Sequence, residues 1–168
     1  MNGEEHSVEK WDMIIAHPPC TYLAVSGCRW NGGQYYKGQY DIFGDLEKSR
    51  LDKRDKAIAF FMEFANAPCE RVAIENPVGV MSTFWRKPDC IYNPYDFEGE
   101  TEQKKTCLWL KGLPPLRPTQ QLPVEKRTQN IFNAIFNGKQ LAWNDKETAK
   151  FRSRTPVGVA RAMSEQWG

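Results

Sequence analysis

Two short apolar runs, each ended by a proline-bearing turn, constrain the fold of this chain more than any other feature. Residues 11–16 (WDMIIA) lead into the turn HPPC at residues 17–20, and residues 71–74 (RVAI) lead into ENP at residues 75–77. Apolar runs of this length, stopped by proline, are typical of buried strands that open into loops. We therefore expect two strands whose carboxyl ends carry polar residues.

Three further segments suggest how these strands are connected. Residues 45–66 predict a helix that presents one apolar face, residues 106–110 (TCLWL) predict a third strand, and residues 155–167 predict a short amphipathic helix with Pro156 in its first turn. Strands separated by helices indicate an α/β fold whose sheet contains parallel strands. The apolar face of the first helix consists of Ala57, Ile58, Phe61, Phe64 and Ala65.

The length of 168 residues fits a single domain over residues 1–168. Two segments show no clear period: residues 119–150, which we leave as an unassigned loop-rich stretch, and residues 26–44, a loop rich in glycine and aromatic residues. The aromatic residues in and near that second loop could stack on a base or could anchor the loop to the core; they are Tyr22, Trp30, Tyr35, Tyr36 and Tyr40.

Composition excludes several classes of protein. The formal net charge is only +2, so any contact with nucleic acid must be local rather than a general attraction to polyanions. No apolar run approaches the ~20 residues that cross a bilayer, and residues 1–10 are charged rather than signal-like. The odd number of cysteines, without a C-x-x-C pair, argues against a disulfide framework and a zinc site; they are Cys20, Cys28, Cys69, Cys90 and Cys107. We expect a cytoplasmic protein.

Cys20 is the first candidate for chemistry. In parallel α/β sheets, ligands gather outside the carboxyl ends of the strands, so polar residues at two strand ends can share one site. A cysteine attacks as its thiolate, which at Cys20 would need nearby donors or positive charge. His17 is close in the sequence, but Pro18 and Pro19 fix its direction. Cys20 could equally be a small buried hydrophobic residue.

Glu75 is the second candidate. Ala73 and Ile74 before it and Pro77 after it predict a partly buried carboxyl group that could donate a proton at neutral pH. The alternative is structural, because a carboxylate at a strand end often caps a following helix or pairs with a lysine.

The HPPC turn at residues 17–20 resembles the Pro-Cys nucleophile loop of the DNA cytosine-5 methyltransferases, and Glu75-Asn76-Pro77 resembles their Glu-Asn-Val motif. The order and the separation of the two motifs also agree with that family. The chain also resembles a family of bacteriophage proteins described as DNA cytosine methyltransferases. The similarity covers most of the chain except residues 119–150 and is carried by the segments IAHPPCTYLAVSG, AIENPVG, KKTCLWLKGLPPL and RSRTPVGVARAMSEQW.

The resemblance implies a Rossmann-like methyltransferase sheet in three layers, with helices on both sheet faces. It implies that Cys20 adds to C6 of a flipped-out cytosine, in DNA or in a cytosine nucleotide, while Glu75 assists at N3. S-adenosylmethionine would donate the methyl group. The residues expected to contact the base or its phosphates, in addition to these two, are His17, Pro19, Asn76, Pro77, Lys104, Lys105, Arg152 and Arg154.

Two departures from the family pattern leave other functions open. Lys104 and Lys105 fall where the family has a Gln-x-Arg-x-Arg element, so a bidentate arginine contact is not preserved. The strand and glycine-rich turn that hold S-adenosylmethionine in the family are missing ahead of residues 11–16, so we expect a truncated sheet. An active enzyme would then need either a cofactor site formed by other residues or a second polypeptide that completes the site.

Two alternatives compete with a methyltransferase-like enzyme of a bacterial host or phage-infected cell. One is a non-catalytic protein, derived from a methyltransferase, that binds a nucleotide, a nucleic acid or a host protein. The other is a different reaction on a nucleobase that uses Cys20 or Glu75 without a methyl donor. Retention of tight binding after Cys20→Ala would indicate the first, and turnover of a nucleotide would indicate the second.

Overall fold

The computed structural model describes residues 10–25, 44–128, 135–136, 139–140 and 154–168. The chain divides into two compact units. The first contains Met1–Asp89 and Cys107–Leu113, and the second contains Cys90–Thr106 and Pro114–Gly168. The expectation of one domain stays a prediction, and each unit is described by itself. In the described residues, no helix is both long enough and apolar enough to cross a membrane.

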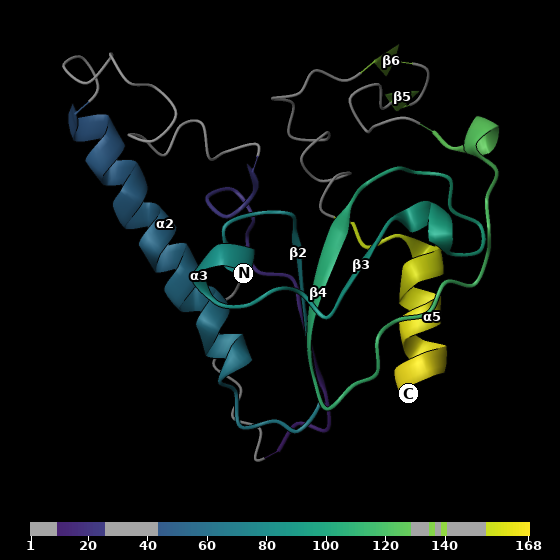
Figure 1. The fold of residues 1–168 in the computed structure, drawn as a ribbon, viewed down its shortest axis with the longest axis horizontal. Coiled ribbons are helices and arrows are strands. Elements are labelled where there is room, and N and C mark those ends of the chain that lie inside the picture. The colour runs from purple at the N-terminus through teal and green to yellow at the C-terminus, as the bar shows by residue number, and fades with distance from the viewer. Residues whose placement is uncertain (1–9, 26–43, 129–134, 137–138, 141–153) are drawn as a thin grey trace. The chain divides into compact units, whose positions relative to one another are not determined.

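Four strands form a mixed open sheet in the order β1-β2-β4-β3, and helices accompany it, so the α/β class is confirmed. These strands are β1 (Ile14–Ala16), β2 (Val72–Pro77), β4 (Thr106–Lys111) and β3 (Cys90–Tyr92). β1 and β2 are parallel, as expected, and α2 (Gly44–Ala65) connects them (Figure 1). β3 was not predicted, because its three residues, CIY, are too few to show a period.

Two strand boundaries differ from the prediction. β1 is shorter than the apolar run, since Trp11 is exposed and pairing starts at Ile14. β2 continues through Pro77, so ENP is the last part of a strand and not a turn that follows it. Asn76 is fully buried there, and its side chain donates a hydrogen bond to the Pro18 carbonyl. Because this polar side chain has a partner, the strand can continue through it into the interior.

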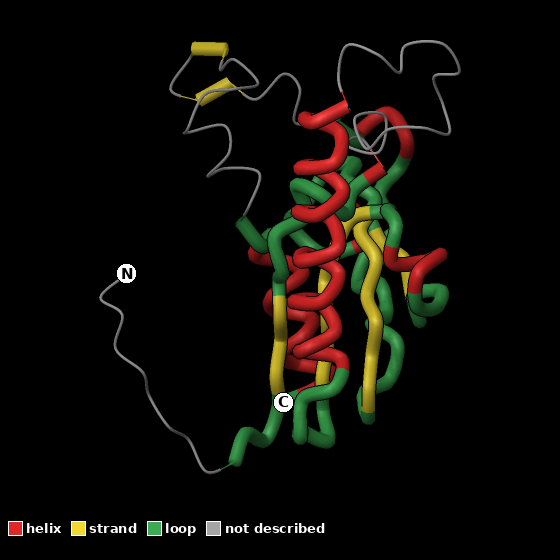
Figure 2. Tube along the Cα trace, turned by 90° about the vertical axis from the view of Figure 1, so that its left-hand side faces the viewer, coloured by secondary structure: helices red, strands yellow, loops and turns green. Residues whose placement is uncertain are grey.

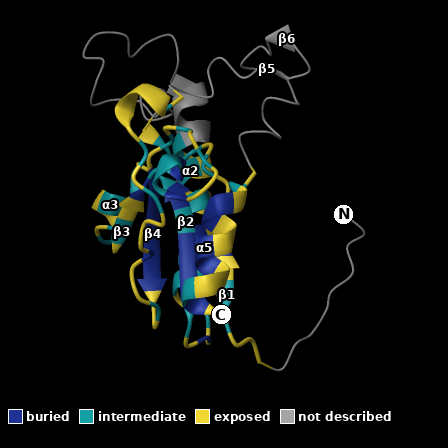
Figure 3. Cartoon of the chain, turned by 90° about the vertical axis from the view of Figure 1, so that its right-hand side faces the viewer, coloured by how far each residue is buried: buried dark blue, intermediate teal, exposed yellow. Residues whose placement is uncertain are grey.

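The interior of the first unit is built from β2, β4 and α2. β2 and β4 are nearly continuously buried, as strands covered on both faces are (Figure 3). Phe61 of α2 is fully buried and packs edge-to-face on Trp109 of β4, with ring centroids 5.3 Å apart. Burial of one such ring contributes about 2–3 kcal/mol to folding. The helix predicted over residues 45–66 is confirmed, and Figure 2 shows α2 lying along the strands.

The second unit is organised around α5 (Val157–Trp167) and a loop. The predicted C-terminal helix is confirmed, but Pro156 is its N-cap residue and does not lie in its first turn. A 3-10 turn, η1 (Pro94–Asp96), follows β3, and a second, η2 (Val124–Lys126), lies within the unassigned stretch. That stretch also contains the short antiparallel pair β5 (Ile135–Phe136) and β6 (Lys139–Gln140).

Candidate site at the carboxyl ends of β1 and β2

The register of β1 and β2 determines which residues meet beyond the end of β1. Ile14 pairs with Val72 and Ala16 with Ile74. The same offset of 58 residues continues past the strand, where it brings His17 opposite Glu75 and Pro18 opposite Asn76. Each of these two pairs is joined by a side chain. The two motifs are therefore adjacent at one edge of the sheet, as the sequence predicted.

His17 and Glu75 form the first connection. His17 Nδ1 lies 2.8 Å from Glu75 Oε2, and this contact becomes an ion pair when the imidazole is protonated. The Glu75 side chain is only 16% exposed, whereas that of His17 is 37% exposed. The carboxyl is therefore the inner partner, and the imidazole lies between it and solvent.

Asn76 forms the second connection. Its Nδ2 donates a hydrogen bond of 2.8 Å to the carbonyl oxygen of Pro18. Pro18 and Pro77 have no N–H, so the next bonds of the backbone ladder, from Pro18 to Glu75 and from Pro77 to Pro18, cannot form, and the Asn76 amide donates to the Pro18 carbonyl in their place. Asn76 Oδ1 is buried and has no hydrogen-bond partner in the described part of the chain. Such orphaned acceptors are rare in folded proteins and cost roughly 1–3 kcal/mol each.

The backbone at Cys20 is fixed by a tight turn. The Cys20 carbonyl accepts hydrogen bonds from the backbone N–H of Leu23 at 3.0 Å and of Ala24 at 2.9 Å. Leu23 is fully buried in the core of the first unit, so it anchors the far end of the turn. Cys20 itself is half-buried and reduced. The structure therefore holds this thiol in a fixed turn without enclosing it completely.

Gly79 joins this turn to the segment after β2. Ala24 and Gly79 form an antiparallel bridge, and Val80 N–H donates to Leu23 O at 2.8 Å. A Cβ atom on Gly79 would lie 1.9 Å from Leu23 O, so no residue with a side chain fits without moving the backbone. Val25 N–H donates to Val78 O on the same stretch. The two motif-bearing segments are thus tied together at their far ends as well.

This arrangement can combine a nucleophile with an acid or a hydrogen-bond acceptor. Cys20 supplies the thiol and Glu75 the carboxyl, and both belong to segments that are joined by side-chain and backbone hydrogen bonds. Metal chemistry has no evident ligand set here, since no group of three His, Cys, Asp or Glu side chains in the described ranges could hold an ion.

The remaining predicted site residues fall into three groups. Pro19 is exposed next to Cys20, and Pro77 is half-buried at the end of β2. Lys104, Lys105 and Arg154 belong to the second unit, with Lys104 half-buried and the other two exposed. Tyr22 is half-buried. The others lie outside the described residues: Trp30, Tyr35, Tyr36, Tyr40 and Arg152.

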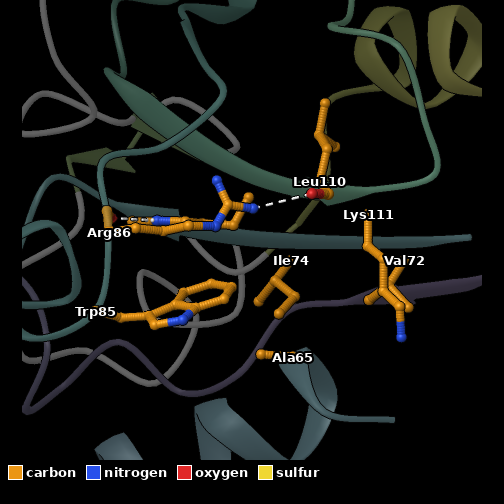
Figure 4. A pocket seen from close by; sticks show the side chains of 8 residues that line it. Ala65, Val72, Ile74, Trp85, Arg86, Leu110 and Lys111 are labelled. Atoms are coloured by element: carbon orange, nitrogen blue, oxygen red, sulfur yellow. Dashed lines mark hydrogen bonds between the residues drawn. The ribbon is translucent and has the colours of Figure 1, made fainter. Parts of the chain in front are cut away.

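A separate pocket of about 200 Å³ lies in the first unit and was not predicted (Figure 4). Its walls include Ile74, Trp85, Arg86 and Trp109, but neither Cys20 nor Glu75. Arg86 is held by Asp89 and by the Leu110 carbonyl, and it stacks on Trp85 at 4.6 Å. Because neither Cys20 nor Glu75 lines it, this pocket is not the place where those two residues would act.

Gly79 is the position whose role sequence reasoning did not identify. A glycine three residues after Asn76 is the one available signal, since glycine near a strand end often marks close approach of two backbones.

Comparison of the chain with protein-family models gave no match, and neither did comparison with curated proteins.

Proposed function

We propose that the edge formed by the Cys20 turn and the end of β2 binds a cytosine base, in DNA or in a nucleotide, and that Cys20 adds to its C6 position. The observation that carries this proposal is the meeting of the two motifs in one register, joined by the His17–Glu75 and Asn76–Pro18 hydrogen bonds. A thiol and a carboxyl on segments joined in this way are the two groups that the resemblance to cytosine-5 methyltransferases requires.

The addition can be written in full. The Cys20 thiolate forms a bond from Sγ to C6, the electron pair of C5=C6 moves to C4–C5, and the pair of C4=N3 moves to N3. N3 takes a proton from Glu75. The Glu75 side chain is only 16% exposed, so few water molecules compete with the base for contact with its carboxyl group. The adduct takes a proton from water at C5 and releases the original C5 hydrogen. Expulsion of the thiolate then returns the N3 proton to Glu75.

S-adenosylmethionine would be the methyl donor implied by the resemblance, but the described residues do not fit its glycine-rich cradle. Gly79, after β2, and Gly112, after β4, both approach the chain's own backbone: added Cβ atoms would lie 1.9 Å from Leu23 O and 2.2 Å from Glu70 O. β1 is followed by two prolines. A donor would have to be held by other residues or by a second polypeptide, so the proposal ends at the addition step.

The finer assignment of the fold belongs to the same proposal. β1, α2 and β2 form a strand-helix-strand unit with parallel strands, which is the repeating unit of Rossmann-like sheets. We infer that the sheet is a truncated methyltransferase sheet and that the protein acts in the cytoplasm of a bacterial host or a phage-infected cell. The candidate site lies at the carboxyl ends of the parallel strands, where ligands of such sheets bind.

The addition step can be tested without a methyl donor. DNA that carries tritium at C5 of cytosine is incubated with the full chain, and release of tritium to water is measured. We expect release by the wild-type protein, no release by Cys20→Ala, and release reduced about 100-fold by Glu75→Gln, because proton transfer to N3 is lost. Exposed Glu125→Gln is the matched control and should behave as wild type.

A second candidate is a binding protein that holds a cytosine base without reacting with it. The misfit between the described glycines and a methyl-donor cradle favours it. It predicts no tritium release, together with DNA or cytidine-nucleotide binding that survives Cys20→Ala. Absence of both release and binding, with every variant folded by circular dichroism, would rule out both candidates.

A further inference from the structure

The contact between His17 and Glu75 uses one atom of each side chain. Nδ1 of the imidazole and Oε2 of the carboxyl are 2.8 Å apart, a distance typical of a hydrogen bond. The contact follows from the backbone, since the β1–β2 register brings these two residues opposite each other. Pro18 then restricts the backbone of His17 to extended conformations, so the imidazole has little freedom to leave.

We propose that His17 is the positioning residue for Glu75: its Nδ1 holds Oε2 and thereby leaves Oε1 as the oxygen that meets the ring nitrogen of the base. This inference rests on the proposed function. A carboxyl group that is free to rotate exchanges its two oxygens, and each exchange moves the acidic proton away from its target. A donor fixed on Oε2 removes that exchange, which lowers the cost of reaching the reactive geometry.

The proposal requires one arrangement of protons in the pair. When Nδ1 carries hydrogen it donates to Oε2, and the acidic proton of Glu75 is then carried on Oε1, toward the base. Nε2 points to the other side of the ring, and since the His17 side chain is 37% exposed, water can satisfy it. His17 thus acts through Glu75 and need not touch the substrate.

The geometry supplies a matched pair of substitutions. In His17→Asn the amide nitrogen occupies nearly the place of Nδ1, because both atoms are bonded to Cγ, so the donor to Oε2 is kept without ring or charge. In His17→Gln the amide lies one bond farther out, nearer the place of Nε2. A structural role through bulk would favour Gln, which is larger; a positioning role through Nδ1 favours Asn.

Two measurements test the proposal. The first is nitrogen NMR of the imidazole in the full chain, which contains two histidines, His6 and His17. His17→Asn assigns the signals, and Glu75→Leu should shift the His17 Nδ1 resonance toward that of an unbonded imidazole. An unchanged Nδ1 resonance in Glu75→Leu would overturn the proposal.

The second measurement is tritium release from C5-labelled cytosine in DNA. His17→Ala and His17→Gln should lower the turnover rate at saturating DNA about tenfold, with little change in the DNA concentration for half-maximal rate, and His17→Asn should restore most of it. Equal loss in Asn and Gln variants would overturn the positioning role. If the wild-type protein releases no tritium but the NMR shift is present, His17 holds Glu75 as proposed and the proposed reaction is what fails.

Discussion

Asn76 in the first unit and Gln120 in the second each tie a loop through a side-chain amide, and the two amides are satisfied differently. In the first unit, Asn76 donates to one carbonyl, that of Pro18, and leaves its own buried oxygen without a partner in the described residues. In the second unit, the Nε2 atom of Gln120 lies within 2.9 Å of three carbonyl oxygens. A native fold leaves few buried polar atoms unpaired, and those that remain concentrate at functional sites.

The contrast therefore separates an amide with a purely structural role, Gln120, from one that leaves a buried polar atom unpaired, Asn76. Gln120 holds the backbone carbonyls of Tyr95, Phe97 and Glu100, and no proposed chemistry depends on it. Asn76 sits beside Glu75 and holds the Cys20 segment at the cost of an orphaned acceptor. The difference indicates that the first unit gives up some stability at Asn76 to keep two segments in place, whereas Gln120 stabilises its loop without that cost.

The largest expected effect comes from adding one methyl group at Gly79. In Gly79→Ala the new Cβ would lie 1.9 Å from Leu23 O, which is backbone and cannot move cheaply, so we expect a loss of about 3 kcal/mol in unfolding free energy. The Ala24–Gly79 bridge should open, and tritium release should fall with it. Urea unfolding and the release assay measure the two effects.

Gly158→Ala is the matched change in the second unit. Its Cβ would lie 2.5 Å from Glu98 O, but Gly158 is in α5, where alanine is favoured over glycine by about 1 kcal/mol. We expect a loss of about 1–2 kcal/mol and unchanged tritium release per folded molecule. If Gly79→Ala proved as mild as Gly158→Ala, the close contact at the proposed site would not be a constraint.

The next effect compares the two amides directly. Gln120→Ala removes the two N–H groups that three partly buried carbonyls share and should cost about 2–3 kcal/mol. Asn76→Ala leaves only Pro18 O without a donor and also removes an unpaired buried acceptor, so it should cost about 1 kcal/mol. Thermal unfolding of both variants gives the order. A larger loss for Asn76→Ala would show that Oδ1 is satisfied in solution, for instance by a buried water.

The elements found correctly from sequence are those whose pattern is local. The helix over residues 45–66 and the strand over residues 106–110 carry their apolar period or run within one segment, and both are confirmed. Pro156 was assigned to the wrong position because proline suits both an N-cap and a first helical turn. β3 and the turns η1 and η2 are too short for any period to mark them.

The candidate site was predictable in its residues but not in its contacts. Proline and polar residues after apolar runs are enough to indicate that Cys20 and Glu75 lie at strand ends. That His17 meets Glu75 depends on the β1–β2 register, which residues 58 positions apart cannot reveal from sequence alone. Likewise, the orphaned oxygen of Asn76 is a property of packing and has no signature in the chain.

The smallest expected effect tests whether a partly buried carboxyl in the second unit, that of Glu102, costs little stability. Burial raises the pKa of Glu102; nearby Lys104 partly opposes this and Glu100 adds to it. A carboxyl whose pKa is raised by folding stabilises the protein below the unfolded pKa, and that contribution is lost as the pH rises through the folded pKa. Glu102→Gln cannot ionise, so it should equal wild type near pH 4 and be more stable near pH 7.

The gain should stay below about 1 kcal/mol, because the Glu102 carboxyl remains partly solvated. Urea unfolding of both proteins across that pH range measures it, and exposed Glu125→Gln controls for the loss of one negative charge. A small gain in unfolding free energy that rises steadily with pH would mean that the Glu102 carboxylate costs the second unit little stability. A gain of several kcal/mol would mean that the second unit also keeps a costly carboxylate. The contrast drawn between Asn76 and Gln120 would then no longer distinguish a site from its support.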